Sequence, residues 1–301
     1  MRAPSGAQYR LEVDDQEATV VEVGGGLRTY TVGGAEVLDG YRVDEMADGG
    51  RGQHLMPWPN RIRDGQYTFA GEDLQLALTE PTRHNASHGL VRWANWTATA
   101  QEADRVVMEL VLHPQPGYPF TLGLAVEYRL GPGGLSVETT ATNLGERPCP
   151  YGAGAHPYVT AGAELVDESL LLVPADTYLE VDDRGIPTGP AAVDGTPFDF
   201  REARPIGDAV LDTPYTDLTG NEAVVAARDG LRRVRLWWDE SYRWLMVFTG
   251  DTLDPARRRR GVAVEPMTCA PNAFVTGDGL RVLEPEESST SVWGIAADPG
   301  R

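Results

Sequence analysis

Two short segments of this sequence place an acid–base pair of side chains where a ligand could reach them. In residues 151–158, small residues lead up to His156 and a proline follows it at once. Pro157 favours extended backbone for the residue before it, so we expect His156 at a strand end, among residues too small to block a ligand. Residues 261–266 form an apolar strand that ends in Glu265. An imidazole that titrates near neutral pH and a carboxylate whose pKa burial raises are suited to general acid–base catalysis.

Each of these two residues also has a simpler interpretation. A single histidine is often a buried residue with a satisfied hydrogen bond, and a glutamate at a strand end is often half of a structural ion pair. Partners elsewhere in the chain therefore decide between structure and catalysis for His156 and Glu265.

The segment 53–63 presents polar side chains from a stiff backbone. Pro57 and Pro59 restrict it just before Asn60 and Arg61. The arginine fork donates to oxygen-rich ligands, so we expect Asn60 and Arg61 to bind substrate. The alternative is a surface loop with a structural ion pair.

The segment 88–96 combines His88 with two tryptophans, Trp93 and Trp96. An aromatic ring beside a hydrogen-bonding group can stack on a sugar and bind its hydroxyls. We expect Trp96 to be a core residue, whereas Trp93 and His88 are candidates for ligand contact. His88, His156 and Glu265 also suggest a zinc site, but none of them lies at a short metal-ligand spacing.

Composition limits the classes of partner. The 301 residues carry a net charge of −19, which disfavours binding to nucleic acid or to an anionic membrane.

Two cysteines, Cys149 and Cys269, make no disulfide framework. A single disulfide bond between them stays an open alternative, and a reducing cytoplasm is the expected location. The sequence begins without an apolar leader and has no membrane-spanning run. The four arginines 257–260 are expected at a loop tip, with a docking patch as the alternative.

Many short strand-like segments separated by glycine and proline predict the fold. Hydrophobic residues make up 41% of the chain, with 34 glycines and 22 prolines, and no segment has a helical period of convincing length. We predict one all-β domain, a large antiparallel β-sandwich over residues 1–301 with few or no helices. Residues 186–200, rich in proline, are expected to form a long loop. The predicted strands are 9–13, 18–23, 27–32, 66–69, 106–112, 122–130, 135–142, 223–227, 231–238, 242–248, 261–265, 280–283 and 291–296.

In their order along the chain, these motifs resemble the aldose 1-epimerase family of galactose mutarotase-like proteins. The matching motifs are Asn60-Arg61-Ile62, His88-Gly89, His156-Pro157-Tyr158, Asp212 and Glu265-Pro266, with 65–71 and 271–274 as further similar segments. The resemblance spans nearly the whole chain. It implies a large β-sandwich and an enzyme that interconverts the α and β anomers of a free aldose without metal or cofactor.

The resemblance also implies roles for the residues. Glu265 would take the proton from the C1 hydroxyl, and His156 would protonate the ring oxygen so that the ring opens. His88 would assist at the ring oxygen. Sugar hydroxyls would be bound by Arg61 and Asp212, with Asp217 as the alternative to Asp212, and by Asn60, Tyr158 and Trp93. We expect a monomer or a homodimer.

The substrate stays open at this stage. His88-Gly89-Leu90-Val91-Arg92 followed by Trp96 resembles the branch that includes hexose-6-phosphate mutarotases, whereas His156-Pro157-Tyr158 does not have that branch's usual form. In a phosphosugar enzyme Arg63 or Arg92 would contact the phosphate; otherwise each is a surface arginine. A catalytically silent sugar-binding protein on the same fold and a metal-assisted enzyme are the competing hypotheses.

Overall fold

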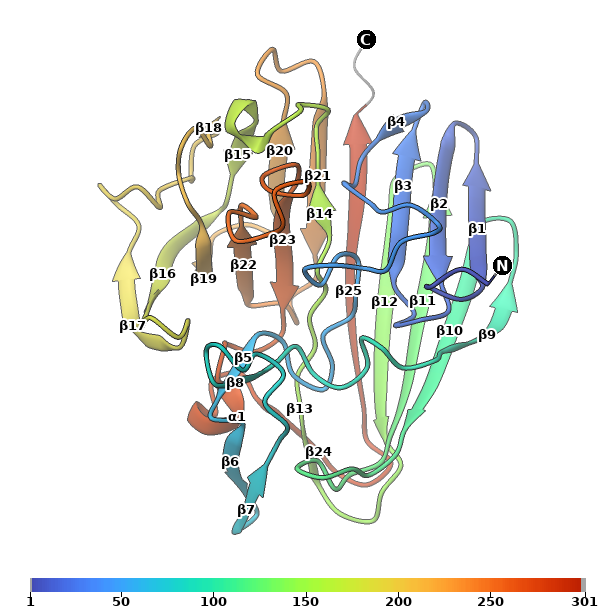
Figure 1. The fold of residues 1–301 in the computed structure, drawn as a ribbon, viewed down its shortest axis with the longest axis vertical. Coiled ribbons are helices and arrows are strands. Elements are labelled where there is room, and N and C mark those ends of the chain that lie inside the picture. Colours follow the sequence, from blue (N-terminus) through green and yellow to red (C-terminus); the bar gives the residue numbers. More distant parts are fainter. Residues whose placement is uncertain (1, 299–301) are drawn as a thin grey trace.

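Antiparallel strands dominate the computed structural model, which describes residues 2–298 (Figure 1). The largest sheet has nine strands, in the order β18 (Arg204–Pro205), β15 (Leu170–Leu172), β20 (Glu222–Ala226), β21 (Arg233–Trp238), β25 (Ser288–Asp298), β12 (Gly134–Asn143), β11 (Leu122–Gly131), β10 (Arg105–Leu112) and β9 (Thr97–Gln101).

Two further sheets lie in front of this one in the view of Figure 1. One has six strands, in the order β14 (Tyr158–Val159), β23 (Val262–Met267), β22 (Trp244–Phe248), β19 (Asp212–Leu218), β16 (Ala175–Val181) and β17 (Pro187–Ala192). The other has four strands, β1 (Gln8–Val13), β2 (Gln16–Val21), β3 (Leu27–Val32) and β4 (Ala35–Glu36).

The remaining elements are short. Three strand pairs are β5 (Arg61–Arg63) with β8 (Asn85–Ser87), β6 (Gln66–Phe69) with β7 (Glu72–Gln75), and β13 (Cys149–Tyr151) with β24 (Arg281–Leu283). Within residues 2–298 the helical structure is α1 (Ala273–Thr276) and one 3-10 turn (Val166–Glu168). The predicted all-β sandwich with few helices is therefore confirmed.

One cluster of buried hydrophobic side chains joins the three large sheets. It includes Leu11 of β1, Leu124 of β11 and Val247 of β22. In β11 the buried residues alternate with partly exposed ones, as period two requires when one face of a strand is covered. Each such aliphatic side chain contributes about 1.5–3 kcal/mol by leaving water. This buried layer makes a rigid support for loops that cross between the sheets.

The prediction for residues 186–200 is wrong, because they contain the strand β17. Pro187 and Pro190 lie in that strand, which pairs with β16 and forms an edge of the six-stranded sheet. An edge strand tolerates proline, since the missing N–H is not needed on the open side. The proline content that suggested a loop is therefore that of an edge strand of the six-stranded sheet.

The arginine run 257–260 holds loops together. Arg259 is paired with Asp167 and Asp251 and also donates to the carbonyls of Ala209 and Gly207. Arg257 is paired with Glu45 and donates to Gly40. These contacts give two of the four arginines a structural role at the expected loop tip.

Both cysteines are buried and free. No helix within residues 2–298 is long and apolar enough to cross a membrane.

Candidate active site

Three side chains from distant parts of the chain meet in one pocket of about 390 Å³, a volume within the range of small-molecule sites. Glu265 comes from β23, His156 from the segment between β13 and β14, and His88 from the residue after β8. The other predicted residues in the lining are Asn60, Arg61, Arg92, Trp93 and Asp212.

Glu265 and His156 form the centre of this pocket. The Nε2 atom of His156 lies 3.3 Å from Oε1 of Glu265, and the two side chains are 5% and 2% exposed. All six residues of β23 are buried, which explains why a carboxylate on this strand is shielded from water. The second oxygen, Oε2 of Glu265, has no hydrogen-bond partner within the described residues and is free for a ligand.

Burial shifts the pKa of both groups toward their neutral forms. It raises the pKa of Glu265 well above its ordinary value, with Asp212 adding to the effect and Arg61 opposing it. It lowers the pKa of His156 to about 3, aided by the positive charges of Arg92 and Arg51. A carboxylate in this environment is a stronger base once ionised, and a protonated imidazole is a stronger acid.

The tautomer of His88 follows from its hydrogen bond. Its Nδ1 accepts from the backbone N–H of Asn60 at 3.2 Å, and its own backbone N–H donates to the Asn60 carbonyl. Burial lowers the pKa of His88 well below its ordinary value, so the ring is neutral and carries its proton on Nε2. Its ring centroid is 5.5 Å from that of His156. His88 can therefore donate one hydrogen bond into the pocket.

A metal ion fits these residues poorly. Ligand atoms of His88, His156 and Glu265 all lie within 4.8 Å of one another. A metal-bound imidazole, however, normally donates its second N–H to an acceptor. The Nδ1 of His88 faces a donor, the Asn60 N–H, and Nδ1 of His156 has no partner within the described residues. The donor set therefore favours acid–base chemistry without a metal.

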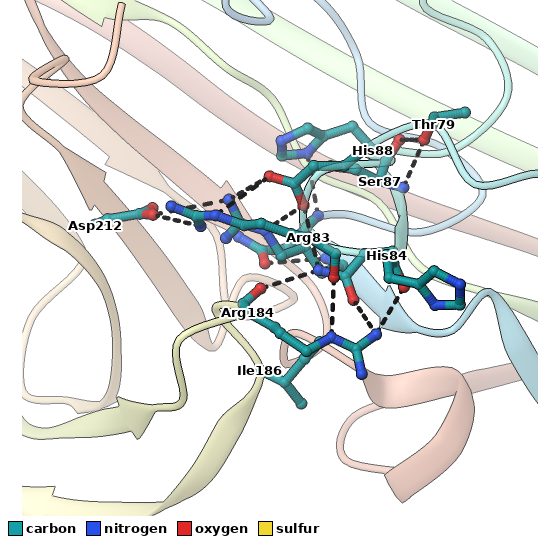
Figure 2. A network of polar contacts seen from close by, with 12 residues as sticks. Thr79, Arg83, His84, Ser87, His88, Arg184, Ile186 and Asp212 are labelled. Carbon is teal, nitrogen blue, oxygen red and sulfur yellow. Dashed lines mark hydrogen bonds and ion pairs between the residues drawn. The ribbon is translucent and has the colours of Figure 1, made fainter.

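Arginines and carboxylates form a polar wall on one side of the pocket (Figure 2). Arg61 binds both carboxylate oxygens of Glu80, at 2.8 and 3.2 Å, and lies 3.7 Å from Asp212. Arg83 points toward Asp212 and reaches it at 3.2 Å. This wall presents donors and acceptors in turn, the pattern that binds sugar hydroxyls. Glu80 and Arg83 were not predicted as site residues, because no sequence motif distinguishes them from ordinary loop residues.

Arg184 supports that wall from behind, as Figure 2 shows. It lies in the turn between β16 and β17, and its guanidinium donates to the backbone carbonyls of Arg83 and His84 and to the side chain of Asn85. The Asn85 side chain donates in return to the Arg184 carbonyl. These bonds fix the segment that leads to His88.

Not every predicted residue contacts the pocket. Tyr158 is buried behind the His156 imidazole and is not among the described residues that line the pocket. Asp217, the alternative to Asp212, lies in a separate hollow next to Trp238. Arg63 is paired with Asp182 and faces another groove. Trp93 lines the pocket and is 52% exposed, whereas Trp96 is buried as predicted.

Arg92 differs from the other arginines of the pocket. It lines the cavity, and burial lowers its pKa. Arg61 and Arg83 have carboxylate partners, but between residues 2 and 298 the Arg92 guanidinium makes no hydrogen bond or ion pair. Its positive charge therefore has no carboxylate partner there, unlike the charges of Arg61 and Arg83.

Comparisons with known proteins identify the family of this chain. The family model described as aldose 1-epimerase matches residues 8–295. The Escherichia coli K12 protein named as uncharacterized protein YihR is 37% identical over 284 residues, covering 93% of this chain and 90% of that protein. Aldose 1-epimerase of Escherichia coli K12 is 33% identical over 167 residues, covering 53% of this chain and 47% of that protein.

The fold has close solved counterparts. The crystal structure of the GalM/aldose epimerase homologue from C. elegans superposes with a TM-score of 0.87 at 19% identity, covering 98% of this chain and 99% of that chain. With the family model matching nearly the whole sequence, the chain belongs to the aldose 1-epimerase family.

Proposed function

We propose that this protein is an aldose 1-epimerase that interconverts the α and β anomers of a free hexose such as glucose or galactose. The main support is the 3.3 Å separation of His156 Nε2 and Glu265 Oε1 inside the pocket. The hydroxyl oxygen and the ring oxygen of a sugar are both attached to C1. An acid and a base that serve these two oxygens must therefore lie side by side.

The reaction needs one proton removed and one supplied. Ionised Glu265 takes the proton of the C1 hydroxyl, the bond between C1 and the ring oxygen breaks, and protonated His156 donates to the ring oxygen. The aldehyde rotates about C1–C2, and reversal of both transfers closes the other anomer. The Nε2–H of His88 stabilises the negative charge that develops on the ring oxygen as its bond to C1 breaks. Each proton transfer by a positioned side chain contributes about 10²–10⁴-fold.

The polar wall suits recognition of the sugar hydroxyls. Arg61 and Asp212 present donors and an acceptor to the pocket, and we propose that they bind hydroxyl groups. Asn60 is placed by its bond to His88 and Trp93 lies at the rim; we propose that they complete the contacts to substrate.

Exchange of anomers measured by proton NMR tests the activity directly. We expect catalytic amounts of protein to accelerate exchange for glucose or galactose above the rate in buffer. Glu265→Gln keeps the shape but cannot accept a proton, so turnover should fall by about 100-fold or more while sugar binding is largely retained. Sugar binding without any acceleration would instead identify a catalytically silent binder. Loss of activity on exhaustive chelation would identify a metal-assisted enzyme.

A second candidate is a hexose-6-phosphate mutarotase, and Arg92 is the observation that favours it. A partly buried guanidinium without a carboxylate partner would gain from a bound phosphate, which arginine binds in bidentate fashion.

The two candidates differ in the response to Arg92→Gln. If the substrate carries a phosphate, we expect the preference for glucose 6-phosphate over glucose to fall by about 10–100-fold, as for loss of a charged hydrogen bond. Arg63→Gln is the matched control, because Arg63 lies outside the pocket. An unchanged preference in Arg92→Gln, or no acceleration with the phosphosugar at all, would leave the free hexose as substrate.

We further propose that the protein acts in the cytoplasm as a monomer or homodimer. Two buried free thiols support a reducing compartment. Light scattering of the purified protein gives the oligomeric state.

A further inference from the structure

His156 has no second hydrogen bond to orient its ring. Its Nε2 faces Glu265, while its Nδ1 is buried without a partner on any other described residue. An imidazole that acts in catalysis is usually oriented by a hydrogen bond on the nitrogen that does not react. Since that bond is missing here, other contacts must hold the ring at the reacting oxygen.

The ring of Tyr158 packs flat against the imidazole. The two ring centroids are 5.0 Å apart and the planes differ by 14°. The guanidinium group of Arg51 also packs on the Tyr158 ring, and its central carbon lies 4.1 Å from the ring centroid. Arg51 and His156 thus both pack on the Tyr158 ring, and we name these three residues the His156 stack.

Hydrogen bonds anchor two members of the stack, Arg51 and Tyr158. Arg51 is 2% exposed and donates to the carbonyl and carboxylate of Asp39, at 2.8 and 2.7 Å, and to Asp48. The Tyr158 hydroxyl donates to the Gly49 carbonyl at 2.9 Å. The bond to Gly49 joins Tyr158 to the loop of residues 44–52, and the bonds to Asp39 hold Arg51, a member of that loop, against the preceding segment.

The same loop also confines the imidazole directly. Gly50 has φ +80°, and a Cβ at this position would lie 2.6 Å from Cδ2 of His156. In addition, the Gly52 N–H donates to the His156 carbonyl at 2.9 Å. The loop therefore leaves room for the imidazole ring and closes against it.

We propose that Tyr158 and Arg51 are positioning residues for the acid His156, and that stacking takes the place of the missing hydrogen bond to Nδ1. This rests on the proposed function, in which His156 protonates the ring oxygen. It gives Tyr158, which the sequence suggested as a sugar ligand, a role behind the imidazole.

The test compares two changes at one position. Tyr158→Leu removes the ring, whereas Tyr158→Phe keeps the ring and removes the bond to Gly49. For the leucine variant we expect kcat to fall by about 10–100-fold, as for a displaced catalytic group, with KM changed by less than about threefold. The phenylalanine variant should recover most of that loss.

Tyr118→Leu controls for the loss of a buried aromatic residue. Tyr118 is fully buried and its hydroxyl donates to the Pro150 carbonyl, so it matches Tyr158 in burial and bonding but lies outside the pocket lining. We expect this variant to lose stability while its kcat stays near that of the parent protein. A folded Tyr158→Leu protein with the parent kcat would overturn the proposal.

A spectroscopic readout separates this proposal from the proposed function. A tyrosine ring stacked on an imidazole shifts the carbon-bound imidazole protons upfield in the NMR spectrum. We expect the shift in the parent and Tyr158→Phe proteins and its loss in Tyr158→Leu, with His156→Gln used for assignment. If the parent turns over no sugar, the proposed function fails, yet the loss of this shift still supports the stack. An unchanged His156 signal in Tyr158→Leu would contradict it.

Discussion

We propose that Glu265 and His156 act as a pair that shares a single proton. Burial disfavours the carboxylate of one and the imidazolium of the other, so the unliganded pair prefers both groups neutral. In the proposed reaction the proton lies on His156 before ring opening and on Glu265 afterwards. The number of protons on the pair does not change, and the same pair can therefore run the reaction in both directions.

A broad pH optimum follows from this pair. A second proton removes the base and loss of the only proton removes the acid, so kcat/KM should be bell-shaped in pH. Since burial lowers the pKa of His156 to about 3 and raises that of Glu265, the plateau should be wide, and its acid limb should lie below ~6.5, the ordinary pKa of histidine. Anomer exchange measured over a pH series, with the buffer rate subtracted, checks this. An acid limb above that value would contradict a buried neutral imidazole.

At the residue scale the sequence predicted which side chains line the pocket better than it predicted their contacts. His156, Glu265, His88, Arg61 and Asp212 all line one pocket; the first four lie beside a turn, a proline or a strand end that the sequence reveals, whereas Asp212 was named only through the resemblance to the family. Which neighbours hold these residues was not predictable. The missing partner of His156 Nδ1 and the stack behind it depend on segments that come together only in the fold.

At the scale of elements, loops complete a site that strands begin: Glu265 lies on β23 and Asp212 on β19, whereas loop segments place the residues around them. The loop of residues 44–52 confines His156, the segment 79–88 carries the polar wall and His88, and the turn between β16 and β17 supports that segment through Arg184. The sequence predicted most strands of the sheets but treated residues 186–200 as a loop. It missed both strands of the hairpin whose turn holds Arg184, and the prolines of β17 suggested a loop although proline is tolerated in an edge strand.

Substitution of Arg184 should therefore lower kcat/KM, although Arg184 does not line the pocket. We expect Arg184→Met to lower kcat/KM by about 5–20-fold, because the segment before His88 loses its fixed position, while stability falls by about 1 kcal/mol or less for a partly exposed polar residue.

The matched control for this variant is Arg201→Met. Arg201 is also partly exposed and its guanidinium also makes several polar contacts, in this case to the carboxylates of Asp176, Asp194 and Asp199, none of which lines the pocket. Steady-state kinetics and urea unfolding of both variants provide the comparison. Equal kcat/KM values in the two variants would show that the bonds of Arg184 are merely structural.

At the scale of the whole molecule, one apolar cluster joins the three large sheets. We propose that the chain is one domain and unfolds in a single transition. The cluster also encloses polar groups, and among these the buried histidines make stability depend on pH. His54 is the clearest case, since it is 2% exposed, lies 2.6 Å from the Tyr128 hydroxyl and has its pKa lowered by burial to about 4.

Mild acid should destabilise the protein through these histidines. The folded pKa of His54, about 4, lies below the unfolded value of ~6.5. Between these values the unfolded state binds more protons, so stability is full above ~6.5 and falls as the pH drops, by up to about 1.4 kcal/mol per pH unit for one histidine. Burial lowers the pKa of His88 as well, so His88 adds to the slope in the same direction, whereas the lowered pKa of His156 is opposed by the raised pKa of Glu265. Urea unfolding from about pH 7 to about pH 5 measures this slope.

His54→Gln retains a donor for the Tyr128 oxygen but cannot take up a proton, and it should flatten the slope by the share of one histidine. A parent protein with constant stability over this range would mean that these imidazoles are not held neutral by the fold, and the wide plateau expected for kcat/KM would lose its basis as well.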